Sequence, residues 1–499
     1  MSITATAAQA DFVPRRAIID IGSNTVRLVI YAGPARAPAV ILNEKVSAKL
    51  GAGVAETRRL PTAGVQTALT ALRRYDRLVA ASGVTQLDVV ATAAVRDAED
   101  GPQFLDQISA IGLNPRLLSG EEEAETSAMG ILAAFPGASG VVADLGGGSL
   151  ELIDIDGRNC SHGVSLPFGT LRLQALRKEG VEQFNRTVTK ALKQADWEAE
   201  PGTTLYLVGG SLRAFARHIM SGLNWPISDP HGFGIEALEA VKFADLLAAK
   251  APEQIQKVAG LSGSRLGSLP DAAALLSILI TSIKPDRIVF SSWGLREGLL
   301  YQALDPAKRA LDPFDAGLGA FVSLYGITPE QVQNVADWAA PVAVGKAKPS
   351  RERIRRGAIA LALAAARIEP NLRASHAVDW ALGKRFIGIR PKDRIMLAAA
   401  MLANSGKLNA PDSWRTIASP DNLREAQGWG LTMRLSRRFC GNFPAALDLC
   451  ALLVEGEVLI LRVDPSCSAL ITDSVQRRLK QLADLLALGC AVRIAPTIP

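Results

Sequence analysis

Two stretches of the chain repeat one pattern of apolar and polar positions. Residues 17–25 read AIIDIGSNT and residues 141–149 read VVADLGGGS, so an apolar run leads each time to an aspartate, an apolar residue, a glycine and small residues. Such runs are typical of buried strands that end in tight turns. The two aspartates, Asp20 and Asp144, lie 124 residues apart. The repeat predicts a duplicated α/β unit with one glycine-containing turn in each half.

The likeness continues downstream of both turns. Residues 26–31 and 150–155 predict a second strand in each half, and residues 38–46 and 159–166 predict a third strand after a short turn. Between the hairpins, helical spacing of apolar residues predicts a helix over 61–82 that stops at Gly83, and residues 87–92 predict a further strand. Two hairpins of one template would place their turns opposite each other across a cleft.

The C-terminal part of the chain has a different pattern. Residues 316–417 are almost wholly helical in character, whereas residues 457–463 and 490–494 predict strands around an amphipathic helix at 474–488. At roughly 150 residues per domain, the length allows about three domains or more. We expect a flexible N-terminus at 1–14, two α/β domains at 15–125 and 126–305, a helical domain at 316–430, and a small α/β domain at 431–499.

The composition excludes some classes of protein. No apolar run reaches the roughly 18 residues that a membrane span needs, and residues 1–11 lack the basic start and apolar core of a secretion signal. The five cysteines, at positions 160, 440, 450, 467 and 490, form neither a CxxC pair nor an obvious disulfide framework. We therefore expect a cytoplasmic protein with buried free thiols and no membrane partner.

The basic residues are concentrated in one segment. The whole chain carries a net charge of +6, while residues 351–394 contain 11 Lys or Arg against four acids and so carry +7 by themselves. This local excess favours a polyanionic partner, although a solvated helix face explains it equally well. We expect no nucleic-acid partner.

The second turn has the chemistry of a phosphate site. Gly146, Gly147 and Gly148 leave the backbone open, so that several N–H groups can point at one anion. Asp144 and Glu151 bracket the turn and are oxygen ligands of the type that a hard divalent cation prefers. A phosphate cradle beside such carboxylates is the minimum that phosphoryl chemistry needs. For the glycines alone, a flexible turn is an equally good explanation.

Charged residues follow two other predicted elements. Arg96 comes just after the strand at 87–92, where a guanidinium could fork onto phosphate oxygens or form a surface salt bridge. Three consecutive acids, Glu121 to Glu123, follow Ser119, which is a suitable helix N-cap. Acids at a helix start are favoured by the helix dipole, and they could also supply a general base that orients water.

Four motifs in this order resemble the exopolyphosphatase/guanosine pentaphosphate phosphatase (Ppx/GppA) family: DIGSNT at 20–25, ATAAVRDA at 91–98, SGEEEA at 119–124 and DLGGGSLE at 144–151. LVGGS at 207–211 and SSWGLREG at 291–298 fit as well. The resemblance implies duplicated α/β domains of the actin, sugar-kinase and Hsp70 superfamily, with a ribonuclease H-like fold. It also implies a mostly α-helical HD-like domain and a small α/β C-terminal domain after them.

The resemblance assigns roles to individual residues. Glu123 matches the family's catalytic glutamate, with Glu122 as an alternative base, and Asp144, Glu151 and Asp20 match metal positions. The phosphate-binding positions are Gly22, Ser23, Asn24, Thr25, Arg96, Gly146, Gly147, Gly148 and Ser149. Gly209, Gly210 and Ser211 stand where nucleotide-using relatives bind adenosine, as a third phosphate-facing turn or a structural strand-to-helix turn. The implied cofactor is Mg²⁺, with a monovalent cation such as K⁺ as an open second requirement.

The HD-like domain departs from its pattern. Residues 399–406 align with a motif whose fifth and sixth positions are often His and an acid, but this chain has Ala403 and Asn404 there. His376 is the only histidine of four in the C-terminal half, so we expect no metal site in this domain. Its basic excess would suit a channel for a polyphosphate chain. The other three histidines share no ligand spacing and are given no role.

Three functions remain open at this point. The first is a Mg²⁺-dependent exopolyphosphatase acting on linear polyphosphate, with hydrolysis of guanosine pentaphosphate as an alternative activity and guanosine penta- or tetraphosphate as alternative ligands. The second is a sugar-kinase-like phosphotransferase, which the position of SGEEEA disfavours. The third is a polyphosphate or alarmone sensor without turnover. A homodimer is expected from the resemblance alone.

Overall fold

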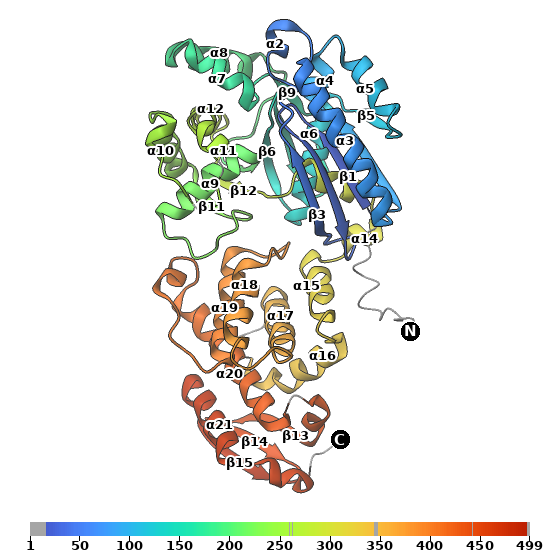
Figure 1. The fold of residues 1–499 in the computed structure, drawn as a ribbon. Coiled ribbons are helices and arrows are strands. Elements are labelled where there is room, and N and C mark those ends of the chain that lie inside the picture. The colour runs from blue at the N-terminus through green and yellow to red at the C-terminus, as the bar shows by residue number, and fades with distance from the viewer. Residues whose placement is uncertain (1–15, 259, 262, 344–347, 442, 497–499) are drawn as a thin grey trace. The chain divides into compact units, whose positions relative to one another are not determined.

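The computed structural model describes residues 16–258, 260–261, 263–343, 348–441 and 443–496 (Figure 1). The flexible N-terminus that we predicted at 1–14 lies outside these residues. The described chain divides into two units. The first, which we call the α/β unit, runs up to Asn224 and resumes over Asp229–Pro313. The second, the helical unit, comprises Trp225–Ser228 and the residues from Phe314 onward.

The first half of the α/β unit is built on a five-stranded sheet in the order β3-β2-β1-β4-β5. Strands β1 and β2 are antiparallel, and β1 and β4 are parallel. The helix predicted over 61–82 is confirmed as α3, and Figure 1 shows it beside this sheet. The elements are β1 Arg16–Ile21, β2 Val26–Ala32, β3 Ala39–Val46, α2 Val54–Thr57, α3 Thr62–Ser82, β4 Gln86–Ala91, α4 Ala93–Asp97, α5 Gly101–Ser109, β5 Pro115–Leu117 and α6 Gly120–Ala134.

The second half has a sheet in the order β11-β12-β10-β6-β7-β8, with β9 also paired to β7. The single third strand predicted at 159–166 is wrong, because two short strands, β8 and β9, pair with β7 in its place. The elements are β6 Ser139–Leu145, β7 Leu150–Asp156, β8 Asn159–Cys160, β9 Val164–Leu166, α7 Thr170–Lys178, α8 Val181–Gln194, β10 Thr204–Val208, α9 Gly210–Gly222, β11 Gly234–Glu236, α10 Ala237–Ala248, η1 Pro252–Gln254, α11 Gly263–Gly267, α12 Leu269–Ile283, β12 Arg287–Phe290, α13 Leu295–Gln302 and α14 Pro306–Ala310.

The two halves repeat one hairpin in the same register. Asp20 stands opposite Arg27 across β1 and β2, and Asp144 stands opposite Glu151 across β6 and β7. Each turn closes with the same backbone hydrogen bond: the N–H of Gly22 donates to the Thr25 carbonyl, and that of Gly146 to the Ser149 carbonyl, both at 3.0 Å. The duplicated α/β unit predicted from the repeated pattern is therefore confirmed.

Helices α6 and α13 connect the two sheets. Alternate residues of β1 face opposite sides, so Ile19 and Ile21 pack in the core that includes α3, while Ile18 packs against Leu299 and Leu300 of α13. Helix α6 packs against the second sheet. The two helices also contact each other. The predicted boundary at 125/126 falls inside α6, and the structure groups both α/β halves in one unit.

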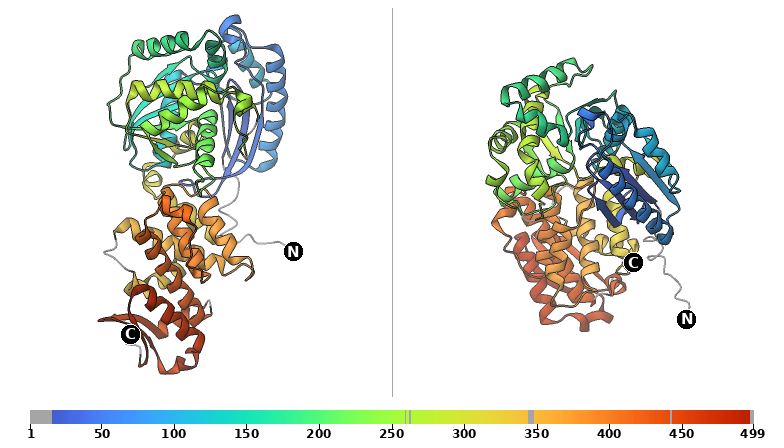
Figure 2. Two further views of the ribbon diagram at one scale, coloured as in Figure 1. Left: turned by 90° about the vertical axis from the view of Figure 1, so that its left-hand side faces the viewer. Right: turned by 45° about the horizontal axis from the view of Figure 1, so that its top comes forward.

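The helical unit has one hydrophobic core, shared by its helices and its small sheet. The predicted boundary at 430/431 falls inside α20, whose apolar residues pack in the same core as those of β14. The sheet has the order β13-β14-β15. Figure 2 shows this unit in two further views. The elements are α15 Pro313–Ser323, α16 Pro329–Trp338, η2 Ala340–Val342, α17 Pro349–Ala365, α18 Arg373–Gly383, α19 Pro391–Asn404, η3 Asp412–Thr416, α20 Pro420–Cys440, η4 Pro444–Leu449, β13 Cys450–Glu455, β14 Val458–Val463, η5 Pro465–Leu470, α21 Asp473–Leu486 and β15 Gly489–Ile494.

The fold bears on two predictions from the sequence, which concern membrane-spanning segments and the burial of the cysteines. Within the described part of the chain, no helix combines the length and the apolar character needed to cross a membrane. All five cysteines are free thiols, but only Cys440 and Cys450 are buried, and Cys490 is exposed on β15. The prediction of buried thiols is therefore wrong for Cys490, because an edge strand leaves that side chain uncovered.

Candidate active site

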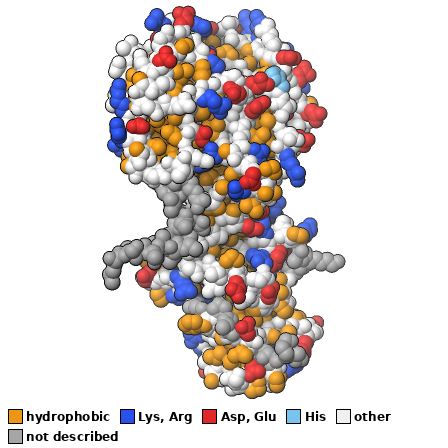
Figure 3. All heavy atoms as spheres, turned by 90° about the vertical axis from the view of Figure 1, so that its right-hand side faces the viewer, with side chains coloured by type: hydrophobic (Ala, Val, Ile, Leu, Met, Phe, Trp, Pro, Cys, Tyr) orange, Lys and Arg blue, Asp and Glu red, His pale blue; other side chains and the backbone are white. Residues whose placement is uncertain are grey.

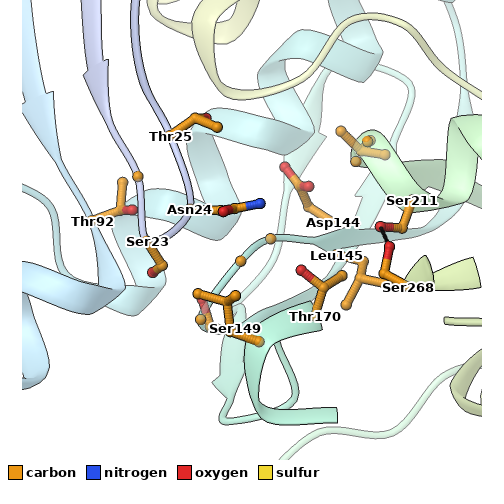
Figure 4. A pocket seen from close by; sticks show the side chains of 18 of the residues that line it. Ser23, Asn24, Thr25, Thr92, Asp144, Leu145, Ser149, Thr170, Ser211 and Ser268 are labelled. Carbon is orange, nitrogen blue, oxygen red and sulfur yellow. Dashed lines mark hydrogen bonds between the residues drawn. The ribbon is translucent and has the colours of Figure 1, made fainter. Parts of the chain in front are cut away.

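A cavity of about 690 Å³ lies in the α/β unit where the turns of its two halves face each other. The turn at 22–25 and the turn at 146–149 both line it, and so does a third turn at 209–211. In Figure 4, Ser23, Asn24 and Thr25 lie opposite Asp144, Ser149 and Thr170. The structure therefore brings together all the predicted turn residues, although they come from three distant parts of the chain.

The glycines of the second turn allow the two hairpins to approach each other. A Cβ atom on Gly148 would lie 2.5 Å from the Ser23 hydroxyl oxygen, and one on Gly147 would lie 3.0 Å from the Asn24 backbone nitrogen. Real Cβ atoms rarely tolerate such distances, so a side chain here would push the turns apart. The same glycines that leave backbone N–H groups accessible to an anion are thus needed to close the site.

Helix α6 places Glu122 and Glu123 in different environments. Ser119 and Glu122 form a capping box: the Glu122 N–H donates to the Ser119 hydroxyl at 3.1 Å, and the Ser119 N–H donates to the Glu122 carboxylate at 2.7 Å. Arg116 also pairs with Glu122. Glu122 is exposed and is not part of the cavity wall, whereas Glu123, one residue further round the helix, lines the cavity.

Glu123 is a buried carboxylate with one cationic partner. Its exposed fraction is 9%. Arg96 donates from Nη1 to Oε2 of Glu123 at 3.1 Å and to the Leu118 carbonyl at 3.0 Å. Burial raises the pKa of Glu123 to about 7; Arg96 opposes this shift, while Asp144 and Asp20 add to it. Arg96 itself contacts Glu123 and is not among the residues that line the cavity.

The predicted metal positions Asp144, Glu151 and Asp20 also lie in the cavity wall. The Ser127 hydroxyl donates to Asp144, and the Ser165 hydroxyl donates to Glu151 at 3.0 Å. Burial raises the pKa of Asp144, and it raises that of Glu151 well above its usual range, where repulsion from Glu123 and Asp144 contributes as well. Asp20 differs from both, because Arg296 donates to its carboxylate at 3.1 Å.

The carboxylates of the cavity fit a divalent cation whose coordination shell is completed by water and substrate phosphates. Within the described ranges, no three His, Cys, Asp or Glu side chains converge closely enough to hold a metal ion by themselves. Mg²⁺ is commonly held by one or two carboxylates together with water and substrate phosphates. Asp144 and Glu151 meet this requirement, since Asp144 is half-buried and Glu151 is buried, each close to another carboxylate, and a cation would relieve their repulsion. Asp20 already has a cationic partner.

The sequence reasoning missed a group of cations in the same cavity. Six basic residues line it: Arg27, Lys45, Lys49, Arg213, Arg265 and Arg296. Burial and mutual repulsion lower the pKa of Arg213 to about 9, and burial together with Arg296 lowers that of Arg27 to about 10. Neither Arg27 nor Arg213 forms an ion pair with a described residue, so no carboxylate at ion-pair distance occupies either guanidinium group.

Arg296 differs from Arg27 and Arg213, because its pKa is raised and theirs are lowered. Although burial opposes its charge, Glu297 and Asp20 raise its pKa. An alignment of the two hairpins would have pointed to Arg27, because it occupies in the first half the position that Glu151 occupies in the second. Arg213 and Arg265 carried no such signal, since only the tertiary structure brings them to the cavity.

The third turn links β10 to α9. Gly209 adopts a φ of 116°, which favours glycine, and a Cβ atom there would overlap the Leu145 carbonyl oxygen. Ser211 lines the cavity, and its hydroxyl lies 3.2 Å from that of Ser268, as Figure 4 shows. The close packing of Gly209 gives the turn a structural reason, and the turn also faces the cavity.

A buried cluster supports the segment that carries Arg296. The Ser292 N–H donates to Nδ1 of His231 at 3.2 Å, and the Ser292 hydroxyl lies 3.3 Å from Oδ1 of Asp229. His231 also stacks on Phe135, at the end of α6, with ring centroids 4.8 Å apart. We had given His231 no role, because the spacing of the histidines carried no signal for this contact.

The basic segment of the helical unit is largely engaged in internal contacts. Arg394 is buried and donates to carbonyls at the end of α18, and Arg355 is buried against Glu352 at 2.7 Å. Arg353 donates to the Gly388 carbonyl at 2.7 Å. On the face drawn in Figure 3, Lys and Arg side chains are interspersed with Asp and Glu. Arg394, Arg355 and Arg353 are therefore engaged in contacts within the helical unit, and Arg394 stabilises the end of α18.

Comparisons with known proteins agree with this geometry. At the level of sequence, the chain is 27% identical over 332 residues to Retrograde regulation protein 2 of Saccharomyces cerevisiae, which covers 59% of this chain and 56% of that protein. The chain thus spans little more than half the length of this relative. It is 24% identical over 311 residues to Exopolyphosphatase 1 of Mycobacterium tuberculosis, covering 58% of this chain and 88% of that one.

Solved structures share the fold. The crystal structure of the Aquifex aeolicus member of the Ppx/GppA family matches with a TM-score of 0.50 and 24% identity, over 58% of this chain and 97% of that one. An exopolyphosphatase from Cytophaga hutchinsonii matches with a TM-score of 0.52 and 21% identity, over 58% and 97%. The model of the Ppx/GppA phosphatase family matches residues 29–307, which is more than half of the 499 residues. The chain belongs to the Ppx/GppA phosphatase family.

Proposed function

We propose that this protein is an exopolyphosphatase, which releases terminal orthophosphate from linear inorganic polyphosphate by Mg²⁺-assisted attack of water. The observation that carries the proposal is the position of Glu123: a buried carboxylate with a pKa of about 7 lies in one cavity with two glycine turns and several cations. Membership of a phosphatase family supports hydrolysis, and the name of the Mycobacterium relative supports polyphosphate as the substrate.

In this proposal Glu123 acts as the general base. The oxygen of a water molecule forms a bond to the terminal phosphorus, Glu123 accepts a proton from that water, and the phosphoanhydride bond to the rest of the chain breaks. Backbone N–H groups of the two turns, together with Arg27 and Arg213, bind the non-bridging oxygens. Arg96 holds Glu123 in place. A Mg²⁺ ion held by Asp144 and Glu151 would offset charge on the phosphate oxygens.

The test compares two neighbouring glutamates. Orthophosphate release from long-chain polyphosphate is measured with and without Mg²⁺ for the wild type, Glu123→Gln and Glu122→Gln. We expect Glu123→Gln to lower the rate by roughly 10² to 10⁴ while polyphosphate binding is kept. Glu122→Gln is the matched control, because glutamine keeps the capping box, and its rate should stay near that of the wild type. Equal activity of the wild type and Glu123→Gln would exclude Glu123 as the base.

Guanosine pentaphosphate is the competing substrate. The cavity volume of about 690 Å³ lies in the range of pockets that bind small molecules, so a nucleotide with a phosphate chain has room. The ratio of kcat/KM for the two substrates decides between them. If the wild type binds polyphosphate or the nucleotide but releases no phosphate, the protein is a sensor. We include this outcome because the yeast relative is named as a regulatory protein.

A further inference from the structure

Four arginines of the helical unit lie close together without an acidic partner. Arg373 begins α18, Arg434 and Arg437 lie on α20, and Arg478 lies on α21. None of the four forms an ion pair with any residue that the structure describes. Arg478 and Arg437 are near enough to repel the charge of Arg434, and Arg373 repels that of Arg437. We call these residues the arginine cluster.

The two arginines of α20 meet the end of helix α19. They are three residues apart and so lie on one face of α20. Arg437 donates from Nη2 to the carbonyl of Asn404, the last residue of α19, at 3.3 Å. The guanidinium of Arg434 packs on Gly406, where an added Cβ atom would overlap its Nη1. That Nη1 atom is buried and has no hydrogen-bond partner.

A second unpaired polar group lies beside the cluster. A cavity of about 30 Å³ is lined by Asn404, Ser436, Arg437 and Cys440, among apolar residues of α16 and α17. Asn404 is 6% exposed, and its Oδ1 atom is buried without a hydrogen-bond partner. Within the described residues, the structure therefore leaves one donor, Nη1 of Arg434, and one acceptor, Oδ1 of Asn404, without a hydrogen-bond partner beside the cluster.

Capping of α19 explains only part of this arrangement. Basic side chains commonly stabilise the carbonyl end of a helix, and Arg437 does so here. One helix end, however, carries only about half a negative charge, which does not balance four arginines. Burial and repulsion between the arginines lower the pKa of both Arg434 and Arg437. A bound anion would relieve this repulsion and satisfy Nη1 of Arg434.

We propose that the arginine cluster is a second binding site, for phosphate oxyanions, and that Arg434 and Arg437 are its principal ligands. Planar guanidinium groups match the geometry of phosphate oxygens. The neutral Asn404 stands where the HD pattern often has an acid, so this position brings no negative charge to the cluster. None of these residues lines the cavity around Glu123. The choice of phosphate among oxyanions rests on the proposed function, whereas the need for an anion does not.

The experiment titrates the full chain with pyrophosphate by calorimetry, in EDTA so that no metal-dependent turnover occurs. We expect two classes of site in the wild type. Arg434→Gln/Arg437→Gln should lose one class or weaken it at least tenfold, and leave the other unchanged. Arg424→Gln/Arg438→Gln is the matched control, because it removes two exposed arginines from the same helix. Arg434→Lys/Arg437→Lys keeps the charge and should retain weaker binding, which separates loss of the site from misfolding.

The outcomes separate this proposal from the proposed function. One class of site in the wild type, or equal binding by the wild type and Arg434→Gln/Arg437→Gln, would overturn the second site. Loss of binding in the control as well would also overturn it, since net charge would then be the cause. If the wild type releases no orthophosphate from polyphosphate but the arginine variant loses a class of pyrophosphate site, the second site stands and the exopolyphosphatase proposal fails. Repeating the titration with orthophosphate and long-chain polyphosphate distinguishes free phosphate from the polymer.

Discussion

Glu122 and Glu123 are neighbours in the sequence with opposite environments. The first turn of α6 directs Glu122 to the helix end, where it closes the capping box, and directs Glu123 into the cavity. Glu123 is held there by Arg96 at 3.1 Å. Its ionisation is opposed mainly by burial, and then by the other carboxylates of the cavity. Two predictions follow from this raised pKa.

The rate of phosphate release should rise with pH as Glu123 loses its proton. A general base must be ionised, and in the protein without metal the pKa of Glu123 is about 7. A bound Mg²⁺ ion would lower this value by its positive charge, so the inflection in kcat/KM should fall between about 4.5 and about 7. Rates measured from pH 4.5 to 9 test this. A profile without any rise over this range would contradict the assignment of Glu123.

Replacement of Glu123 should stabilise the protein at high pH. The folded-state pKa lies above the usual value of 4.5, so the folded protein binds more protons between pH 4.5 and about 7, and its unfolding free energy falls as pH rises through that window. A glutamine side chain does not ionise in this pH range, so the variant does not lose stability in this way. We expect Glu123→Gln to gain on the order of 1–3 kcal/mol over the wild type between pH 4.5 and pH 8, measured by urea unfolding without Mg²⁺. A difference that does not depend on pH would show that burial does not shift this group.

At the scale of elements, the contact between α6 and α13 positions the site. Helix α6 carries Glu123, and Arg296 of α13 holds Asp20. The two helices approach closely at glycines: a Cβ atom on Gly130 would overlap the Gly294 carbonyl, and one on Gly298 would overlap the Thr126 carbonyl. The spacing of the two helices therefore depends on the absence of side chains at these positions.

Gly298→Ala should separate the two helices. The added methyl group meets backbone atoms, which cannot rotate away, so we expect a loss of roughly 1–3 kcal/mol in stability. Misplacement of Glu123 should also reduce kcat, by about 10². Thermal unfolding and phosphate release measure the two effects. Gly222→Ala is the control, since this helical glycine has nothing within 4 Å of an added Cβ; equal behaviour of the two variants would contradict the packing argument.

At the scale of the whole molecule, the cavity belongs to one of the two units. Every residue that lines it lies in the α/β unit, including the turns at 22–25 and 146–149. The short segment Trp225–Ser228 lies between two parts of the α/β unit in the sequence, but it belongs to the helical unit. Ile227 is 2% exposed and packs in the core of that unit.

A chain that ends at Pro313 should therefore still release phosphate. We expect it to fold when Ile227 is replaced by serine, because the isoleucine would otherwise be left without its core. Metal-dependent release of orthophosphate from tripolyphosphate should stay within about tenfold of the full chain, since kcat depends on the cavity residues. Circular dichroism and phosphate release test this. A folded but inactive product would show that the helical unit contributes to the reaction.

Much of the fold could be predicted because its signals are local. The apolar runs before Asp20 and Asp144, the glycines that follow them, and the helical spacing at 61–82 each depend on residues within a few positions of one another. The broken strand at 159–166 was missed, because only pairing with β7 decides where a strand is interrupted. The predicted boundaries at 125/126 and 430/431 fall inside α6 and α20, because a local pattern does not show where a shared core ends.

The sequence by itself determined the repeated hairpins, the turns and the three consecutive acids at the start of α6. Only the tertiary structure decided which acid faces the cavity, because that depends on where α6 starts and on what surrounds it. It also decided that Arg27, Arg213 and Arg265 share this cavity, although Arg27 and Arg265 are 238 positions apart in the sequence. The physical reason is that burial and Coulomb interactions, which set charge and pKa, sum over neighbours in space, and neighbours in sequence do not reveal them.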